Sequence, residues 1–179
     1  MPLKAGTAVR DISPQKPMFL VGYPHVERTS TGIHDPLLAS ALYLDNGKDS
    51  ALLVALDILF LDPPTARELR RDMARKTGVK EQCVFISCSH THSGPVTMEM
   101  LSWQEDPIVP RVDPSYMRYL KENVIEAAVA ATKNTHAAEI AWTSAAVDGV
   151  GCNRNDPRGP RDPEASILIV RNPANKRIQ

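Results

Sequence analysis

Two histidines, His90 and His92, are the residues of this sequence whose type and spacing could do chemistry. They follow an apolar segment, a single threonine separates them, and Ser93-Gly94-Pro95 turns the chain directly afterwards. Side chains at i and i+2 of an extended chain point to the same face, so the two rings converge if that geometry persists through Thr91. Two neutral imidazoles can hold a zinc ion, but a catalytic zinc usually needs a third protein ligand. The alternative is that both rings only hydrogen-bond loop carbonyls at the end of a strand.

Arg154 is a second candidate for a functional role. It lies in a glycine-rich loop between two asparagines, where its guanidinium offers a fork of donors to a carbonyl, a carboxylate or a developing oxyanion. The competing interpretation is a surface ion pair with Asp156 or Asp162. Of the remaining histidines, we interpret His25 as a loop residue and His136, between a helix and a strand, as a solvated one.

These candidates need elements that position them, and the first is a strand over 4–12 whose apolar residues alternate. Ser13-Pro14 ends that strand. The loop over 14–35 that follows is rich in Pro, Gly, Ser and Thr and contains His34. Long loops without secondary structure of their own are often functional in compact domains. We therefore expect this loop to contribute to a site.

A β-hairpin and a βαβ unit are predicted next. Their elements are strands over 37–44 and 51–59, a helix over 63–76 and a strand over 83–89. Asn46-Gly47 between the first two strands is a strong hairpin signal, because both residues tolerate a positive φ. Strand, helix and strand then form a right-handed crossover, so the last two strands run parallel. Ligands gather beyond the carboxyl ends of such strands, which is where His90, His92 and Asp57 fall.

The second half of the chain adds loops, one helix and two strands. Its predicted elements are a proline-rich loop over 94–114 that includes Trp103, a helix over 115–133, a strand over 138–147, a loop over 149–157 and a strand over 165–170. The pattern predicts an α/β fold: a mixed sheet with a βαβ unit and a β-hairpin, and helices packed on the sheet. The length is that of a single domain, 1–179.

Composition excludes several classes of protein. The chain has 21 Lys and Arg against 21 Asp and Glu, so no field of one sign attracts nucleic acid or anionic lipid. Its three cysteines are too few and too scattered for a disulfide framework. No apolar run is long enough to span a bilayer, and the N-terminus lacks the apolar core of a signal peptide. We expect no nucleic-acid partner, no transmembrane segment and a cytoplasmic location, or secretion if a leader was removed.

The order of the motifs resembles the N-terminal part of the neutral (non-lysosomal) ceramidase family and its shorter bacterial relatives. The similar stretches are AGTAVRDISP, Gly22-Tyr23, GIHDPLLASAL, VALDI, SHTHSGP and CNRND. They span nearly the whole chain. The most specific are HTHSGP and the later Asn153-Arg154.

The resemblance implies a zinc-dependent amidohydrolase that cleaves the N-acyl bond of ceramide, a small-molecule lipid amide, into a fatty acid and sphingosine. By the same resemblance, His90 is a zinc ligand, and His92 is a catalytic residue beside the reacting carbonyl. Arg154 contacts polar groups of the substrate and acts in catalysis, and we add His34 as a second substrate-binding residue. Zinc lowers the pKa of its water to about 7 and polarises the carbonyl, which suits this reaction.

The chain also departs from the family pattern. The remaining zinc ligands of the family, a second His, a Glu and a Tyr, and a Ser in the pocket all come from regions downstream of Asn153-Arg154. We therefore expect 1–179 to be the N-terminal fragment of a longer ceramidase-like catalytic domain. The first alternative is a non-catalytic or incomplete module that binds metal or ligand without turnover. The second is a hydrolase of the same architecture that acts on a different amide or ester.

Overall fold

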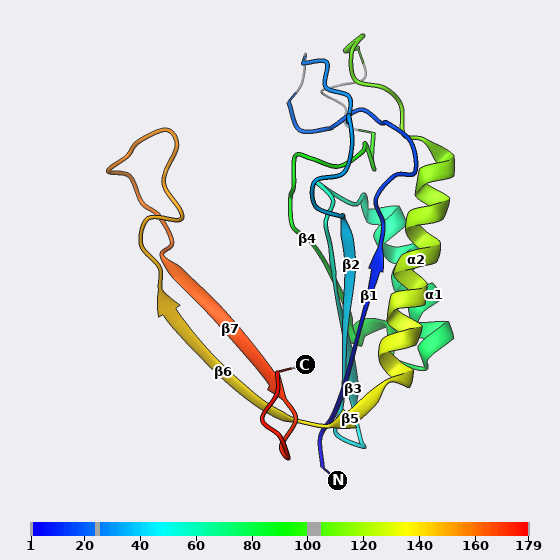
Figure 1. Cartoon of the computed structure of the whole chain (residues 1–179), viewed down its shortest axis with the longest axis vertical. Helices are drawn as coiled ribbons and strands as arrows, with labels where there is room; N and C mark the ends of the chain where they lie inside the picture. Colours follow the sequence, from blue (N-terminus) through cyan, green and yellow to red (C-terminus); the bar gives the residue numbers. More distant parts are fainter. Residues whose placement is uncertain (1, 24–25, 100–104, 179) are drawn as a thin grey trace. The chain divides into compact units, whose positions relative to one another are not determined.

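Figure 1 shows the computed structural model of the chain, which describes residues 2–23, 26–99 and 105–178. The chain divides into two compact units, Met1–His136 and Ala137–Gln179. Each unit has a β-sheet of its own. The organisation of 1–179 as a single domain, and as part of a longer catalytic domain, stays a prediction.

The described part of the first unit is built on a five-stranded mixed sheet in the order β4-β3-β2-β1-β5. Its strands are β1 (Lys4–Asp11), β2 (Leu38–Asp45), β3 (Ser50–Leu56), β4 (Val84–Cys88) and β5 (Thr135–Ala137). β2 pairs antiparallel with both β1 and β3, whereas β4 runs parallel to β3. This topology confirms the predicted α/β fold class, with its β-hairpin and its βαβ unit.

The turn between β2 and β3 forms where Asn-Gly predicts it. The side-chain oxygen of Asn46 accepts hydrogen bonds from the backbone N–H groups of Lys48 and Asp49, at 2.9 and 2.8 Å. The turn sets Asp45 opposite Ser50 and so fixes the register of the two strands. That register directs Ala39, Ala41, Leu52, Val54 and Leu56 into one buried core.

Helix α1 (Pro63–Thr77) connects β3 to β4 and has a capping residue at each end. The carboxylate of Asp62 accepts a hydrogen bond from the Thr65 N–H at 2.8 Å, which satisfies one of the free donors of the first turn. Gly78 ends the helix in a left-handed conformation, with φ at 78°, and donates its N–H to the Ala74 carbonyl. A short 3-10 turn, η1 (Glu81–Cys83), then leads into β4.

Helix α2 (Pro114–Lys133) begins at an aspartate as well. The carboxylate of Asp113 accepts hydrogen bonds from the N–H groups of Ser115 and Tyr116, at 2.8 and 3.2 Å. The Tyr116 hydroxyl reaches the far end of β1 and donates to the carbonyl of Ile12 at 3.0 Å. This contact ties the start of the helix to the end of the first strand.

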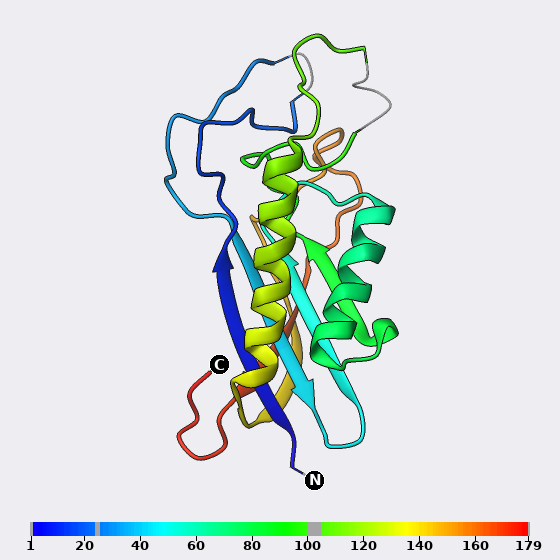
Figure 2. The ribbon, with the colours of Figure 1, turned by 90° about the vertical axis from the view of Figure 1, so that its right-hand side faces the viewer.

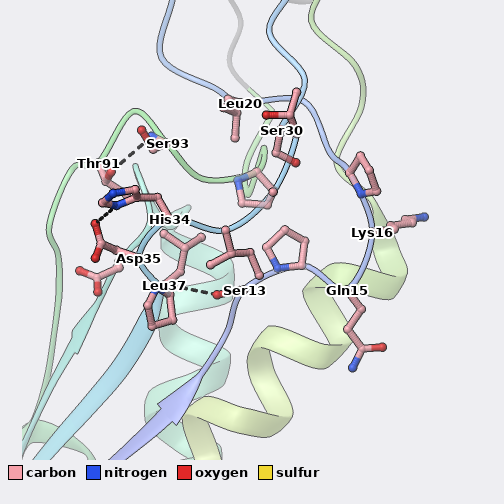
Figure 3. Close-up of a pocket in the computed structure, with 18 of the residues that line it drawn as sticks. Ser13, Gln15, Lys16, Leu20, Ser30, His34, Asp35, Leu37, Thr91 and Ser93 are labelled. Carbon is pink, nitrogen blue, oxygen red and sulfur yellow. Dashed lines mark hydrogen bonds and ion pairs between the residues drawn. The ribbon is translucent and has the colours of Figure 1, made fainter.

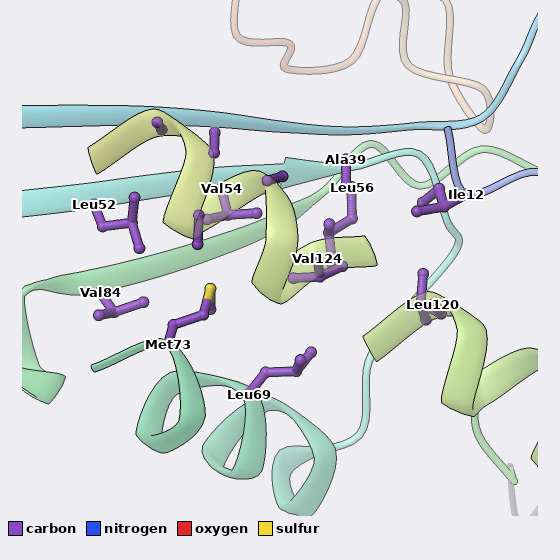
Figure 4. Packing of buried hydrophobic residues seen from close by; sticks show 14 of the residues in the cluster. Ile12, Ala39, Leu52, Val54, Leu56, Leu69, Met73, Val84, Leu120 and Val124 are labelled. Atoms are coloured by element: carbon purple, nitrogen blue, oxygen red, sulfur yellow. The ribbon is translucent and has the colours of Figure 1, made fainter. Parts of the chain in front are cut away.

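Helices α1 and α2 cover the same face of the sheet, as Figure 2 shows. The hydrophobic core lies between that face and the two helices (Figure 4). Leu69 and Met73 enter it from α1, and Leu120 and Val124 enter it from α2. All four side chains are at most 1 % exposed. The two helices therefore pack tightly on the sheet and fix the positions of its strands.

Strand β5 is the element that the sequence does not predict. It lies beside β1 at the edge of the sheet, where a helix-to-strand connection was expected. His136 belongs to this strand and is exposed, as a solvated residue would be. Three residues are too few to show a periodic pattern, so only pairing with β1 reveals the strand.

The second unit is an antiparallel pair of strands, β6 (Glu139–Ala146) and β7 (Glu164–Arg171). Both strands agree with the predicted ranges. The carboxylate of Glu139 lies 2.9 Å from Arg171 and 3.2 Å from Lys176, and the hydrogen bonds from Lys176 and Arg171 hold the pKa of Glu139 below its usual value. Within the described ranges, neither helix of the protein has the length and apolar character needed to cross a bilayer.

Candidate functional site

The two histidines lie just beyond the carboxyl end of β4. After β4 ends, the chain stays hydrogen-bonded to the end of β3 and the residues that follow it. The Ser89 N–H bonds to the Leu56 carbonyl at 2.9 Å, and the His90 N–H bonds to the Ile58 carbonyl at 3.1 Å. His90 adopts a positive φ of 60°, so the extended geometry assumed from the sequence does not persist. The rings of His90 and His92 nevertheless lie side by side, with centroids 5.2 Å apart and planes at 73°. The expected convergence is present, and a left-handed turn accompanies it.

Among the described residues, only one nitrogen of the His90 ring forms a hydrogen bond. Its Nδ1 lies 3.3 Å from the carbonyl oxygen of Leu59, which can only accept, so this bond places the ring proton on Nδ1. The Phe60 ring packs edge-on against the imidazole at 4.9 Å. A metal-ligating histidine usually donates its other N–H to a carbonyl or carboxylate in this way. His90 is therefore oriented so that Nε2 can act as a metal ligand.

The His92 ring is enclosed more tightly. Its Nδ1 is buried and has no hydrogen-bond partner within the described part of the chain. Gly22 packs against the residue so closely that a side chain at position 22 would overlap Nδ1, Cγ and Cβ of His92. The Tyr23 ring makes an edge contact at 5.0 Å, and Arg28 donates to the His92 carbonyl at 2.8 Å. Because an unpaired buried N–H costs more than an unpaired lone pair, the tautomer with its proton on Nε2 is favoured.

Sequence reasoning assigned no role to the side chains that contact the two histidines. Tyr23 and Arg28 belong to the long loop that was expected to contribute to a site, and Phe60 follows β3. Gly22-Tyr23 was a usable signal, since a glycine beside an aromatic residue in such a loop indicates a close approach. Arg28 offered none, because its partner lies 64 residues further along the chain.

The set of metal-capable side chains is incomplete. In the described ranges, no group of three or more His, Cys, Asp and Glu residues is arranged to hold a metal ion. Two imidazoles 5.2 Å apart, one with an orientated free nitrogen, do fit part of a zinc site. His90 thus suits zinc as one ligand, and the described residues do not provide the rest of a ligand set.

A cavity of about 1120 Å³ lies beside the histidine segment (Figure 3). Ser89, Thr91, Ser93 and Pro95 line it, whereas His90 and His92 do not. Alternate residues of one short segment therefore serve two different surfaces. The other walls come from the loop between β1 and β2 and from Asp57. A functional role for this loop stays a prediction.

His34 and Asp57 both line this cavity. The His34 ring is almost fully exposed and its Nδ1 lies 2.7 Å from the carboxylate of Asp35. Asp57 lies at the same edge as Ser89, as predicted, but its carboxylate accepts a hydrogen bond from the Leu38 N–H at 3.1 Å. Asp57 thus holds the start of β2, and His34 keeps an accessible ring at the cavity.

Arg154 lies in the second unit, in the loop that joins β6 to β7. Its side chain is exposed, and no ion pair of Arg154 with Asp156 or Asp162 is found within the described residues. The loop around it is ordered by Asn153, whose side-chain oxygen accepts from the N–H groups of Asn155 and Asp156. The role of Arg154 towards a substrate stays a prediction. His25 and Trp103 lie outside the described residues.

The fold and the site define this chain as an α/β protein with two paired histidines beyond the carboxyl end of a parallel strand. The family model described as neutral/alkaline non-lysosomal ceramidase, N-terminal, matches residues 4–166. The chain belongs to this family, which confirms the resemblance drawn from its motifs.

Solved structures support the fold. The chain is similar to neutral ceramidase from Pseudomonas aeruginosa, with a TM-score of 0.82 and 19% identity over 99% of this chain. It is also similar to a structure titled "Ceramidase complexed with C2", with a TM-score of 0.84 and 18% identity over 99% of this chain. In both comparisons the chain spans 30% of the length of the solved protein.

Proposed function

We propose that this chain supplies part of the active site of a zinc-dependent amidohydrolase of the neutral ceramidase type. Its substrate is ceramide or a related lipid amide, whose N-acyl bond is hydrolysed to a fatty acid and an amine. The observation that carries the proposal is the pairing of the His90 and His92 rings, 5.2 Å apart, in a chain that belongs to the ceramidase family.

His90 and His92 have different proposed roles in amide hydrolysis. Zinc, when bound, lowers the pKa of a water to about 7 and polarises the amide carbonyl. His90 would hold the ion through Nε2, because its Nδ1 is engaged by the Leu59 carbonyl. His92 would donate a hydrogen bond from its Nε2–H to the reacting carbonyl oxygen and to the oxyanion that develops on it, since its Nδ1 is buried. Water adds to the carbonyl carbon, one of its protons passes to the amide nitrogen as the C–N bond breaks, and the products are the carboxylic acid and the amine.

Two further residues are assigned to the substrate. Arg154 is exposed and has a guanidinium that can bind polar groups of the lipid or the developing oxyanion. His34 has an exposed ring at the 1120 Å³ cavity and is proposed to bind substrate there. The balance of 21 basic and 21 acidic side chains agrees with an uncharged ligand and not with nucleic acid.

A second candidate function is a module that binds metal or ligand without turnover. It is favoured by one observation: the described residues contain no group of three or more metal-capable side chains placed around one point. In this role His90 and His92 form a two-histidine site of weak affinity. The two candidates predict different affinities for zinc.

Zinc binding and hydrolysis together test the proposal. In a protein that joins this chain to the downstream segment that the resemblance implies, isothermal titration with zinc should show one tight site, lost in His90→Ala and kept in His136→Ala, which removes an exposed histidine of β5. The same joined protein should hydrolyse an N-acyl sphingoid, with loss of turnover on chelation and recovery with zinc. Turnover that a chelator leaves unchanged, or no hydrolysis of any acyl amide, contradicts the enzyme. Weak zinc binding without turnover supports the module.

A further inference from the structure

We propose that Arg28 is a positioning residue for His92, acting through the Tyr23 ring and through the main chain. The inference rests on the proposed function, because the ring that it positions is the one assigned to the reacting carbonyl oxygen. Arg28 is not a catalytic residue in this scheme. Its role is to fix where the His92 imidazole stands relative to His90.

Arg28 makes two contacts that converge on His92. Its guanidinium donates a hydrogen bond to the His92 carbonyl at 2.8 Å. The guanidinium carbon also lies 4.7 Å from the centre of the Tyr23 ring, in the range of a cation–π contact. Tyr23 in turn meets the imidazole edge-on at 5.0 Å. One cation therefore holds both the backbone of His92 and the aromatic ring that borders its side chain.

The backbone near Arg28 is anchored to the histidine segment as well. The Val21 N–H bonds to the Gly94 carbonyl at 3.0 Å, and the Leu20 N–H bonds to the Arg28 carbonyl at 2.7 Å. These bonds bring Gly22 against the His92 ring, where no side chain would fit. The imidazole is thus bounded by Gly22, by Tyr23 and by His90, and it has little room to change rotamer.

This enclosure matters because hydrogen-bond donation to a reacting oxygen depends on position. A displacement of about 1 Å at a reacting group can lower a rate by about a hundredfold. With Nδ1 of His92 buried, Nε2 is the nitrogen left to meet a substrate, so a rotation of the ring removes the only usable donor. Loss of Arg28 would free the Tyr23 ring and the His92 carbonyl together.

Proton NMR on the zinc-free chain tests the contact without any need for activity. A nuclear Overhauser cross-peak between the Tyr23 and His92 ring protons is expected in the wild type and in Arg111→Met, which removes an exposed ion pair with Glu99. Arg28→Met should weaken that cross-peak severalfold, and Arg28→Lys should restore part of it. An unchanged cross-peak in Arg28→Met overturns the proposal. If Arg28→Met does not fold, Tyr23→Phe and Tyr23→Ala replace it, and only the alanine should shift the His92 signals.

Kinetics separate this inference from the proposed function. In N-acyl sphingoid hydrolysis, Arg28→Met should lower kcat by about tenfold to a hundredfold and leave KM within about twofold, while Arg111→Met matches the wild type. A fall in kcat/KM that comes from KM alone overturns the positioning role. If the wild type shows no hydrolysis but the cross-peak responds as described, the proposed function fails and the positioning of His92 stands.

Discussion

The imidazole rings of His90 and His92 lie 5.2 Å apart, edge to face, although only one residue separates them and the first has a positive φ. Each ring is oriented by a different neighbour: a main-chain carbonyl engages His90, and a glycine and a tyrosine border His92. The pair therefore comes from the loop packing around β4 and not from the regular geometry of a strand.

The glycine against His92 gives the first prediction. Gly22→Ala should destabilise the protein by about 2–4 kcal/mol, because the new methyl overlaps the imidazole and the backbone holds a positive φ. Gly32→Ala is the matched control, since Gly32 has no neighbouring atom within 4 Å and should change stability by less than about 0.5 kcal/mol. Urea unfolding monitored by circular dichroism measures both, and equal midpoints would contradict the close packing.

The two tyrosines of α2 provide a second matched pair. Tyr116 and Tyr119 donate to the carbonyls of Ile12 and Asp11, each at 3.0 Å, but only the first bond is buried. Tyr116→Phe leaves a buried carbonyl unsatisfied and should cost about 1–2 kcal/mol. Tyr119→Phe leaves a carbonyl that water can reach and should cost less than about 0.5 kcal/mol. Denaturant titration of the two variants distinguishes them, and a larger loss for Tyr119→Phe would refute this account.

Acid stability depends on the aspartate that begins α2. The hydrogen bond from Lys16, and then those from the Tyr116 and Ser115 N–H groups, hold the pKa of Asp113 below its usual value of 3.8. A lowered folded pKa contributes stability that is present above pH 3.8 and is lost as the pH falls through the folded pKa. Asp113→Asn keeps an acceptor at the cap and removes this titration. Its stability should approach that of the wild type as the pH falls from about 5 to about 2, and a constant gap across that range would disprove the contribution.

The cysteines should differ in their reaction with iodoacetamide. Burial raises the pKa of the Cys88 thiol, so less of it is thiolate at a given pH, whereas Cys152 is exposed in the loop between β6 and β7. Because the thiolate is the nucleophile, Cys152 should be alkylated several times faster than Cys88. Peptide mapping by mass spectrometry after timed labelling follows both sites, with labelling in denaturant as the control. Faster reaction at Cys88 would show that this thiol is accessible.

Local chemistry made most of the fold predictable. Asn46-Gly47 specifies the hairpin, Pro63 and Gly78 delimit α1, and the crossover rule directs the histidines to the carboxyl end of β4. Strand β5 was missed because its three residues gain their structure only from β1.

The candidate site was predictable in part. His90 and His92 were identified from their spacing, and the long loop from its length and composition. The contacts of Arg28 and Tyr23 with His92 were beyond reach, because they join residues far apart in the sequence through a loop without periodicity. The positive φ of His90 has no signature in the sequence either, because a positive φ is uncommon for histidine and no glycine marks the turn at this position.

In the segment 89–95, residues that line the cavity alternate with the two histidines, and this arrangement bears on any attempt to inhibit the protein. A compound that fills the 1120 Å³ hollow would meet the hydroxyl groups of Ser89, Thr91 and Ser93 and would not touch either imidazole. A metal-chelating inhibitor directed at His90 would have to bind outside that lining, because neither imidazole belongs to it. Inhibitors of this protein would therefore be sought as two separate chemical series, one for the hollow and one for the histidines.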